Sequence, residues 1–354
     1  MKILHTADIH LRGEKDERWE VLRKLIKLAG EEQVDIFAIS GDLFDSGVDA
    51  GVLRPRIREM FSDISFEILL IPGNHDIHSY VSGFYFGGGI RILDDPETPA
   101  EFEDVRVWGM PFEEGLSSED VMKKLSSLAP RLNPEGTDIL LYHGELLDSF
   151  YSRKDFGDEG DRRYMPARLS FFRDINLDYV LAGHFHSRFA VWQIEGGGYF
   201  VYPGSPVSIT RRETGRRSVN IFEVGEEPGK YPLDAPYFEE VQVKLDPLSG
   251  EDPENLVASC LSDLPPEAKI LLTVSGYINS AEDGLSESDL EDIIRDIAGS
   301  NLADYTFLAR DIGAILNDEL FIQFVKKLEE KEYGTEEKER VREAALRAMM
   351  EAAE

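Results

Sequence analysis

Short apolar runs, each closed by polar residues and glycine, recur through the first 225 residues of the chain. They occupy residues 2–8, 34–42, 67–76, 138–145 and 178–186. Because the runs are rich in β-branched residues and bounded by turn signals, they predict strands that are buried on both faces.

Segments with helical periodicity separate these runs. Between the first two runs, apolar residues recur every three or four positions, at Trp19, Leu22, Leu25, Ile26 and Ala29. A second amphipathic stretch, 121–128, follows Ser117 and Ser118, which are favourable N-cap residues. Alternating strands and helices predict a layered α/β-sandwich domain, which we assign to residues 1–225.

The pattern changes after a turn-rich stretch, 226–236, which we interpret as a linker. Beyond it the sequence predicts strand, helix, strand, helix and strand, at 238–245, 253–264, 269–278, 286–298 and 304–312. This order predicts a smaller α+β domain at 237–313. Two amphipathic helices, 317–332 and 335–353, are predicted in the C-terminal segment 314–354.

Composition restricts the class of protein. The chain has 354 residues, 42% of them hydrophobic, so it can bury a core despite a net charge of −31. This acidity argues against indiscriminate coating of nucleic acid. The single cysteine, Cys260, excludes a disulfide framework and a cysteine-based zinc site. We find neither a signal peptide nor an apolar run long enough to span a membrane, and expect a cytoplasmic protein.

Each of the five apolar runs ends in side chains that can bind metal ions. The candidate ligands are Asp8, His10, Asp42, Asn74, His143, His184 and His186. Ligands at the carboxyl ends of several strands converge on one edge of an α/β sheet. The i, i+2 spacing in D-x-H and H-x-H points both side chains of each pair the same way where strand geometry persists.

This mixed set of imidazoles, carboxylates and an amide suits divalent ions such as Mn(II), Fe(II) or Zn(II). Seven ligands are too many for one ion with an open position, but suit two ions that share a bridging carboxylate. Two such ions can hold a hydroxide and stabilise an in-line displacement at phosphorus. The residues therefore predict hydrolysis of a phosphoester.

The ordered motifs D-x-H, G-D-x-x-D, G-N-H-D, H-G and G-H-x-H resemble those of the calcineurin-like metallophosphoesterase superfamily. Within it, MKILHTADIHL, SGDLFD and the turn at 202–206 look most like the SbcD (Mre-eleven) type of DNA double-strand-break repair nuclease. The resemblance extends over nearly the full length and is weaker after residue 236.

The resemblance implies two ions, usually manganese, with iron, zinc or magnesium as alternatives. It places one ion on Asp8, His10, Asp42 and His186, and the other on Asp42, Asn74, His143 and His184, so that Asp42 bridges them. It also implies that His75 contacts the scissile phosphate and acts in catalysis.

Asp45 departs from the pattern, because SbcD-type nucleases usually have histidine at this position. The residue is either a carboxylate that supports its neighbours or one that positions the substrate.

Basic residues bracket the last metal motif, and residues 153–217 hold 11 Lys/Arg against 8 Asp/Glu. We interpret them as contacts to a DNA backbone, chiefly Arg211, Arg212, Arg216 and Arg217. The set also includes five residues earlier in the same stretch, Arg153, Lys154, Arg162, Arg163 and Arg168. The alternative is a solvated surface balanced by neighbouring carboxylates.

The last two predicted helices each have one apolar face. The resemblance implies that this segment binds the coiled coil of an SMC-like ATPase of the SbcC (Rad-fifty) type, and that the protein is a homodimer. The candidate contacts are Leu320, Phe321, Phe324 and Leu328. Periodicity fits ordinary packing within the chain equally well.

The sequence thus favours a two-metal, manganese-dependent DNA phosphodiesterase, an exonuclease or endonuclease of double-strand-break repair. A phosphatase or phosphodiesterase of nucleotides or small phosphoesters is the first alternative, supported by Asp45 and the acidic balance. A non-catalytic subunit that binds DNA ends or the ATPase is the second.

Overall fold

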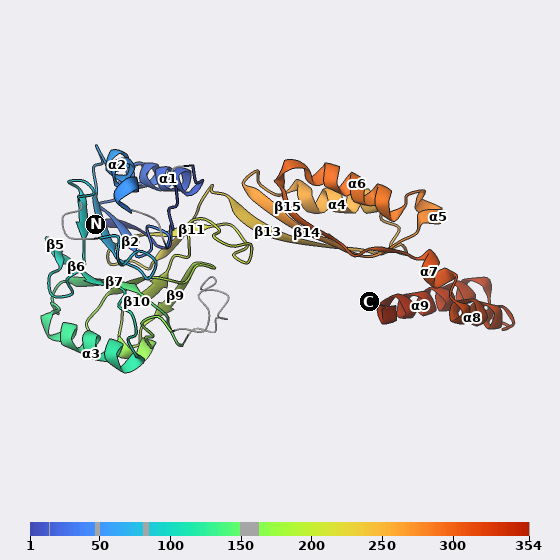
Figure 1. The fold of residues 1–354 in the computed structure, drawn as a ribbon. Helices are drawn as coiled ribbons and strands as arrows, with labels where there is room; N and C mark the ends of the chain where they lie inside the picture. The colour runs from blue at the N-terminus through green and yellow to red at the C-terminus, as the bar shows by residue number, and fades with distance from the viewer. Residues whose placement is uncertain (14, 47–49, 81–84, 149–162, 354) are drawn as a thin grey trace. The chain divides into compact units, whose positions relative to one another are not determined.

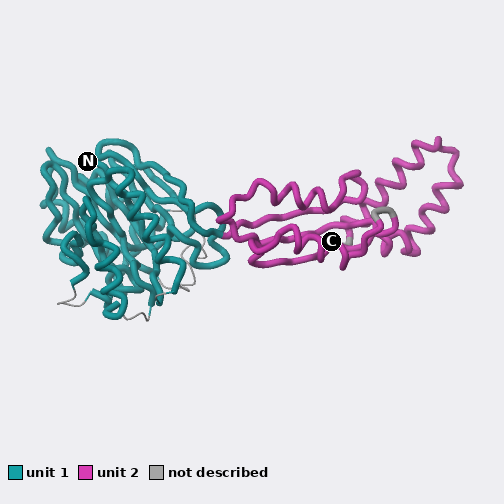
Figure 2. The backbone as a smooth tube through the Cα atoms, turned by 90° about the horizontal axis from the view of Figure 1, so that it is seen from above, with its two compact units in different colours: residues 1–237 teal, residues 238–354 magenta. Residues whose placement is uncertain are grey.

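The computed structural model describes residues 1–13, 15–46, 50–80, 85–148 and 163–353. Within these ranges the chain forms two compact units, Met1–Tyr237 (unit 1) and Phe238–Glu354 (unit 2), shown in different colours in Figure 2.

Unit 1 contains two mostly parallel sheets that stack face to face and carry helices on their outer sides (Figure 1). In order across the first sheet, the described strands are β12 (Gly229–Pro232), β11 (Ser218–Glu223), β1 (Lys2–Thr6), β2 (Ile36–Ser40), β3 (Glu67–Ile71) and β4 (Ile90–Ile92). Those of the second sheet are β5 (Ala100–Phe102), β6 (Val105–Met110), β7 (Thr137–His143), β8 (Tyr179–Gly183), β10 (Tyr199–Tyr202) and β9 (Ala190–Gln193). The predicted layered α/β fold is therefore confirmed.

Strand β2 shows why these runs are apolar throughout. Ile36 and Ala38 belong to the apolar cluster between the two sheets. Phe37 and Ile39, on the opposite face, pack in the cluster beneath the outer helices. A strand buried on both faces has no position that favours a polar side chain, so its sequence shows no alternation.

Three helices cover the outer faces of the sheets: α1 (Arg18–Glu31), α2 (Ala50–Met60) and α3 (Ser118–Leu128). Helix α3 begins at the predicted N-cap, where Ser117 and Asp120 form a capping box that satisfies backbone N–H groups. Val121, Leu125 and Leu128 then pack in the apolar cluster of the second sheet.

The interpretation of residues 226–236 as a linker is wrong. Strand β12 lies within this stretch and pairs with β11 at the edge of the first sheet. Leu233 and Ala235, which follow it, are buried in the core of unit 1. Proline and glycine suggested a linker, but an edge strand tolerates Pro232 because one side of its backbone has no strand to pair with.

Unit 2 has the predicted order of strand and helix. Its elements are β13 (Tyr237–Leu245), α4 (Pro253–Ser262), β14 (Ala268–Ile278), α5 (Ser280–Asp283), α6 (Glu287–Ala298), β15 (Leu302–Phe307) and β16 (Arg310–Asp311). Helices α4 and α6 pack on one face of the sheet (Figure 1), where Val257, Leu290 and Ile294 are fully buried.

Three helices follow the sheet of unit 2: α7 (Gly313–Leu316), α8 (Glu319–Glu329) and α9 (Thr335–Ala353). Phe321 and Leu328 of α8 are buried against α7, α9 and Tyr277, and Phe324 is partly buried there. This packing contradicts the prediction that these residues form an exposed docking stripe with Leu320, which alone of the four is exposed. None of the helices in the described part of the chain has both the length and the apolar character needed to cross a membrane.

Asp138, at the start of β7, provides a test of the core of unit 1. Its buried carboxylate accepts two hydrogen bonds from Arg106 (3.0 and 2.8 Å), one from Trp108 Nε1 (2.8 Å) and one from the Asn133 N–H (2.6 Å). We expect Asp138→Asn to lower the free energy of unfolding by about 2–4 kcal/mol, because buried donors lose a charged acceptor. Urea unfolding followed by tryptophan fluorescence measures this change, since Trp19, Trp108 and Trp192 all lie in unit 1. An unchanged midpoint would contradict the expectation.

Candidate metal centre

The loops that follow β1, β2, β3, β7 and β8 bring all seven candidate ligands to one edge of unit 1. Asp8, His10 and His186 offer ligand atoms that lie within 4.8 Å of one another, and so do Asp8, Asp42 and His143. Asn74 joins the second group, because its Oδ1 lies 2.8 Å from His143 Nε2 and 3.1 Å from His184 Nδ1. The predicted convergence of strand ends therefore occurs in the structure.

Asp42 lies between the two groups. Its Oδ2 is 3.6 Å from His10 Nε2 on one side and 3.5 Å from His143 Nε2 on the other. Its Oδ1 accepts a hydrogen bond from the backbone N–H of His75 (2.9 Å). Asp42 thus lies close to ligands of both groups, as expected of a bridging ligand, and Asp8 is a member of both groups as well.

The backbone is strained at this edge. Asp8, His10, Asp42 and His184 have φ values of 55°, 50°, 54° and 93°. Non-glycine residues adopt this left-handed region rarely and at a cost of about 1–3 kcal/mol each, which the surrounding structure must offset. Such strain concentrates at functional sites, since it directs side chains that a relaxed strand end would turn elsewhere.

The chemistry of the donor set fits divalent cations. His10 Nε2, Asp42 Oδ2 and His186 Nε2 are buried and make no hydrogen bond within the chain. Leaving such atoms buried and unsatisfied is costly, and a cation would satisfy all three.

His143 provides a second sign that this edge favours positive charge. Its Nδ1 donates to the Ser40 carbonyl (2.8 Å), so that Nε2 faces the oxygens of Asn74 and Asp42. Burial lowers the pKa of His143, but the charge and close contact of Asp42 and the charge of Asp8 outweigh it and raise the pKa to about 9. Burial raises the pKa of Asp42, yet the charge and close contact of His143 bring it well below its usual value. A metal ion supplies the same positive charge without a proton.

His75, the predicted catalytic residue, is held beside this centre and remains partly exposed. Its Nδ1 lies 2.6 Å from Ser46 Oγ and 3.3 Å from Asp45 Oδ1. Its ring packs edge-on against that of His10, with centroids 4.5 Å apart. These contacts orient the imidazole at the edge where the candidate ligands gather.

Asp45 contacts three other side chains in addition to that of His75. It also lies 3.5 Å from His10 Nδ1 and 3.6 Å from Arg18 Nη1, and it accepts a hydrogen bond from Arg12 Nε. Burial raises the pKa of Asp45, but the hydrogen bonds from His10, His75 and Arg12 outweigh it and keep the pKa far below its usual range. The carboxylate is thus an anionic support for both histidines.

The predicted basic set divides into exposed and buried members. Arg211 and Arg212 are exposed, and Arg216 is exposed and bonded to Asp234. Arg217 is buried, and its guanidinium donates to the carbonyls of Ser205 (2.9 Å), Ser187 (2.9 Å) and His186. The prediction that Arg217 contacts DNA is therefore wrong. Of the remaining cations, Arg163 pairs with Glu145, Arg168 pairs with Asp148, and Arg153, Lys154 and Arg162 lie outside the described residues.

Two buried carboxylates of the site were not predicted. Asp76 accepts hydrogen bonds from the Gly73 N–H (2.7 Å), the Phe44 N–H (3.1 Å) and the Tyr80 hydroxyl (2.8 Å), which ties the loops after β2 and β3 together. Glu213 Oε1 lies 3.4 Å from His186 Nδ1. The place of Asp76 within G-N-H-D was a usable signal, whereas Glu213 had none, because it stands among arginines in what looked like a solvated loop.

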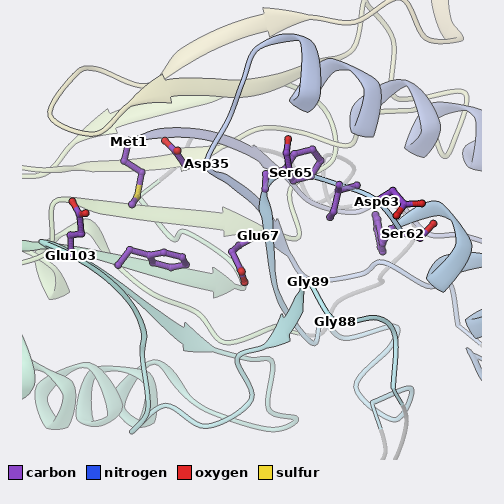
Figure 3. A pocket seen from close by; sticks show the side chains of 13 residues that line it. Met1, Asp35, Ser62, Asp63, Ser65, Glu67, Gly88, Gly89 and Glu103 are labelled. Atoms are coloured by element: carbon purple, nitrogen blue, oxygen red, sulfur yellow. The ribbon is translucent and has the colours of Figure 1, made fainter.

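A separate cavity of about 820 Å³ lies at the other end of the first sheet (Figure 3). Its lining includes residues that precede or begin strands, such as Asp35, Glu67 and Gly89. The candidate ligands, in contrast, follow the strand ends. None of the residues that line this cavity belongs to the ligand clusters found in the described part of the chain.

Comparison with known proteins agrees with this arrangement. The sequence model of the family described as calcineurin-like phosphoesterase matches residues 1–188. A DNA double-strand break repair protein Mre11 of Saccharolobus solfataricus is 27% identical over 238 residues, which cover 60% of this chain and 56% of that protein. The protein of the same name from Sulfurisphaera tokodaii is 26% identical over 234 residues, covering 60% and 55%. The chain thus spans about half the length of the curated relatives it matches.

The solved structures that the chain matches are more distant in sequence. TT1561 of Thermus thermophilus is 15% identical, with a TM-score of 0.40, over 62% of this chain and 92% of that one. A dimetal phosphatase from Danio rerio is 13% identical, with a TM-score of 0.40, over 62% and 91%.

Gly73 offers a test of the ligand geometry. A Cβ added there would overlap the Asp42 carboxylate and lie 2.6 Å from the Asp42 backbone nitrogen. We expect Gly73→Ala to displace Asp42 and to weaken metal binding by about tenfold or more, since changes beside the ligands typically cost 10–100-fold. Metal content after gel filtration, measured by inductively coupled plasma mass spectrometry, reports the effect. Gly30→Ala, where a Cβ meets nothing within 4 Å, is the matched control. Equal metal content in the two variants would contradict the proposed role of Asp42.

Proposed function

The chain belongs to the calcineurin-like phosphoesterase family, and from this premise we propose that it is a manganese-dependent DNA phosphodiesterase that acts in double-strand-break repair in the cytoplasm. The observation that carries the proposal is the convergence of Asp8, His10, Asp42, Asn74, His143, His184 and His186 on one edge of unit 1. The names of the two Mre11 relatives support DNA as the substrate.

Under this proposal, different residues at this edge have different roles in the reaction. Two divalent ions, held by the seven ligands and sharing Asp42, would supply an activated hydroxide and neutralise charge at the phosphorus. His75 would contact the scissile phosphate and stabilise its developing charge, or protonate the leaving oxygen. Asp45 would keep the His75 ring in place through Nδ1. Arg211 and Arg212 would contact the DNA backbone beyond the site.

We extend the proposal to partners. The resemblance to SbcD-type nucleases suggests a homodimer that binds the coiled coil of an SMC-like ATPase. Of the four predicted contacts on α8, Leu320 is the one whose side chain is exposed, so it is the one that such a partner would contact.

A phosphatase or phosphodiesterase of small phosphoesters is the second candidate. It is favoured by Asp45, which stands where the repair nucleases usually have histidine and which lies 3.3 Å from His75 Nδ1. An anionic residue beside the site repels an extended polyanion more than it repels a single phosphate group.

His75→Ala separates the proposed activities. We expect the variant to lose about 100- to 10,000-fold in Mn(II)-dependent cleavage of linear DNA, because a positioned acid–base group is removed, while its metal content stays unchanged. Cleavage is followed on gels, alongside turnover of bis-p-nitrophenyl phosphate. The matched control is His78→Ala, three positions away and exposed, which should cleave like the original chain.

The results distinguish three functions. Loss of DNA cleavage in the His75 variant supports the nuclease. Activity of the original chain on the small ester alone supports the second candidate. Metal binding without either activity supports a non-catalytic subunit.

Reversal of Arg211 and Arg212 to Glu tests the DNA contacts. We expect DNA affinity to fall by about 10- to 100-fold, and the slope of log affinity against log salt to become shallower by about 2, as each phosphate contact contributes close to one unit. Fluorescence anisotropy at several salt concentrations measures both. Reversal of Arg131 and Arg173, which are exposed beside the amino ends of β7 and β8, controls for net charge. Equal losses in the two double variants would remove Arg211 and Arg212 from the proposal.

A further inference from the structure

We propose that Glu213 is a positioning residue that fixes the His186 imidazole for metal binding and makes the Asp8–His10–His186 position the tighter of the two. This inference rests on the metal-binding part of the proposed function. It concerns a residue before β11, in a segment whose sequence resembles a charged surface loop.

Glu213 is fully buried and held from several directions. Its Oε2 accepts a hydrogen bond from the Ile209 N–H (2.7 Å), and its Oε1 lies 3.3 Å from Thr210 Oγ1. The Ser208 hydroxyl donates to the Glu213 carbonyl (2.7 Å). A buried carboxylate with this many fixed contacts is a rigid acceptor rather than a solvated charge.

The rigid carboxylate sets the orientation of His186. An ionised carboxylate can only accept, so the proton of the imidazole lies on Nδ1, 3.4 Å from Glu213 Oε1. The other ring nitrogen, Nε2, then carries the lone pair and faces Asp8 Oδ1 at 3.7 Å. Nε2 is buried and makes no hydrogen bond within the chain, as expected for a metal-ligating atom. This is the carboxylate–histidine–metal arrangement, in which the acceptor both orients the ring and raises its basicity.

The same segment also holds the backbone of both ligands. Arg217 donates to the carbonyl of His186, and the Ser205 hydroxyl donates to the carbonyl of Asp8 (2.8 Å). Residues 205–217 therefore hold the main chain of Asp8 and His186 through hydrogen bonds, and the side chain of His186 through Glu213.

The histidines of the two metal positions differ in the charge of the group that faces their Nδ1 atom. His10 and His186 each face a carboxylate through Nδ1, from Asp45 (3.5 Å) and Glu213 (3.4 Å). His143 instead donates through Nδ1 to a neutral backbone carbonyl, that of Ser40 (2.8 Å). Anionic support makes an imidazole the stronger donor, so the position that contains His10 and His186 binds its ion more tightly. Asp45 also interacts with Arg12 and Arg18, and Glu213 with the buried Arg217, so both carboxylates contribute to the difference.

Titration of the metal-depleted full chain with Mn(II), by isothermal calorimetry, tests the inference. The original chain is expected to bind two ions with different dissociation constants. In Glu213→Gln, which keeps the size of the side chain and removes its charge, the tighter constant should weaken by about 10- to 100-fold while the weaker one stays unchanged. Glu213→Asp keeps the charge but withdraws it from Nδ1, so the same selective loss is expected.

Asp138→Asn is the matched control, because it perturbs a buried carboxylate at the opposite end of β7 and should lower stability without changing either constant. If Glu213→Gln does not fold, Glu213→Asp decides the question. Unchanged constants in a folded Glu213 variant, or an equal weakening of both, would overturn the role of Glu213 while leaving the two-metal function standing. A failure of the original chain to bind Mn(II) would overturn both.

Discussion

The buried negative charge of Asp8 and Asp42 is the constraint on which the rest of the metal edge depends. Both carboxylates are fully shielded from water, and such groups are stable only when cations or several donors surround them. Histidines surround the two carboxylates, yet Asp42 Oδ2, His10 Nε2 and His186 Nε2 make no hydrogen bonds within the chain. Divalent cations are the species whose charge and coordination suit such a set of buried donors.

The buried carboxylates can be held in place only by a rigid surrounding structure. The left-handed φ values of Asp8, His10, Asp42 and His184 are unfavourable in isolation, and two stacked sheets with a dry core between them offset the cost. Asp76 joins the loops after β2 and β3, while Ser205 and Arg217 join those after β1 and β8. The loops that bear the ligands are thus bonded to one another, so that a shift of one would strain the others.

The sequence predicted those parts of this arrangement whose signals are local. An apolar run closed by a ligand marks both a buried strand and its carboxyl end, which is why the fold and the positions of Asp42 and His143 followed from the pattern. Long-range burial has no such signal. Glu213 and Arg217 looked like surface charges, because nothing near them in sequence shows that His186 lies beside them. For the same reason the apolar face of α8 gave no indication that α9 covers Phe321, and the prolines around β12 concealed an edge strand.

The acidity of the chain and an anionic substrate are compatible because charge acts locally here. The net charge of −31 is unevenly distributed, with −19 in residues 226–354 and −12 in residues 1–225, and water and salt screen exposed charges beyond roughly 10 Å at 0.1 M ionic strength. Arg211 and Arg212 are exposed in the segment that supports Asp8 and His186, and two divalent cations at the metal edge would add positive charge there. Distant carboxylates then weaken non-specific adhesion more than they weaken engagement at the metals. For the proposed phosphodiester substrate, an acidic surface with cations at the metal edge would favour binding at the metal centre over binding elsewhere on the protein.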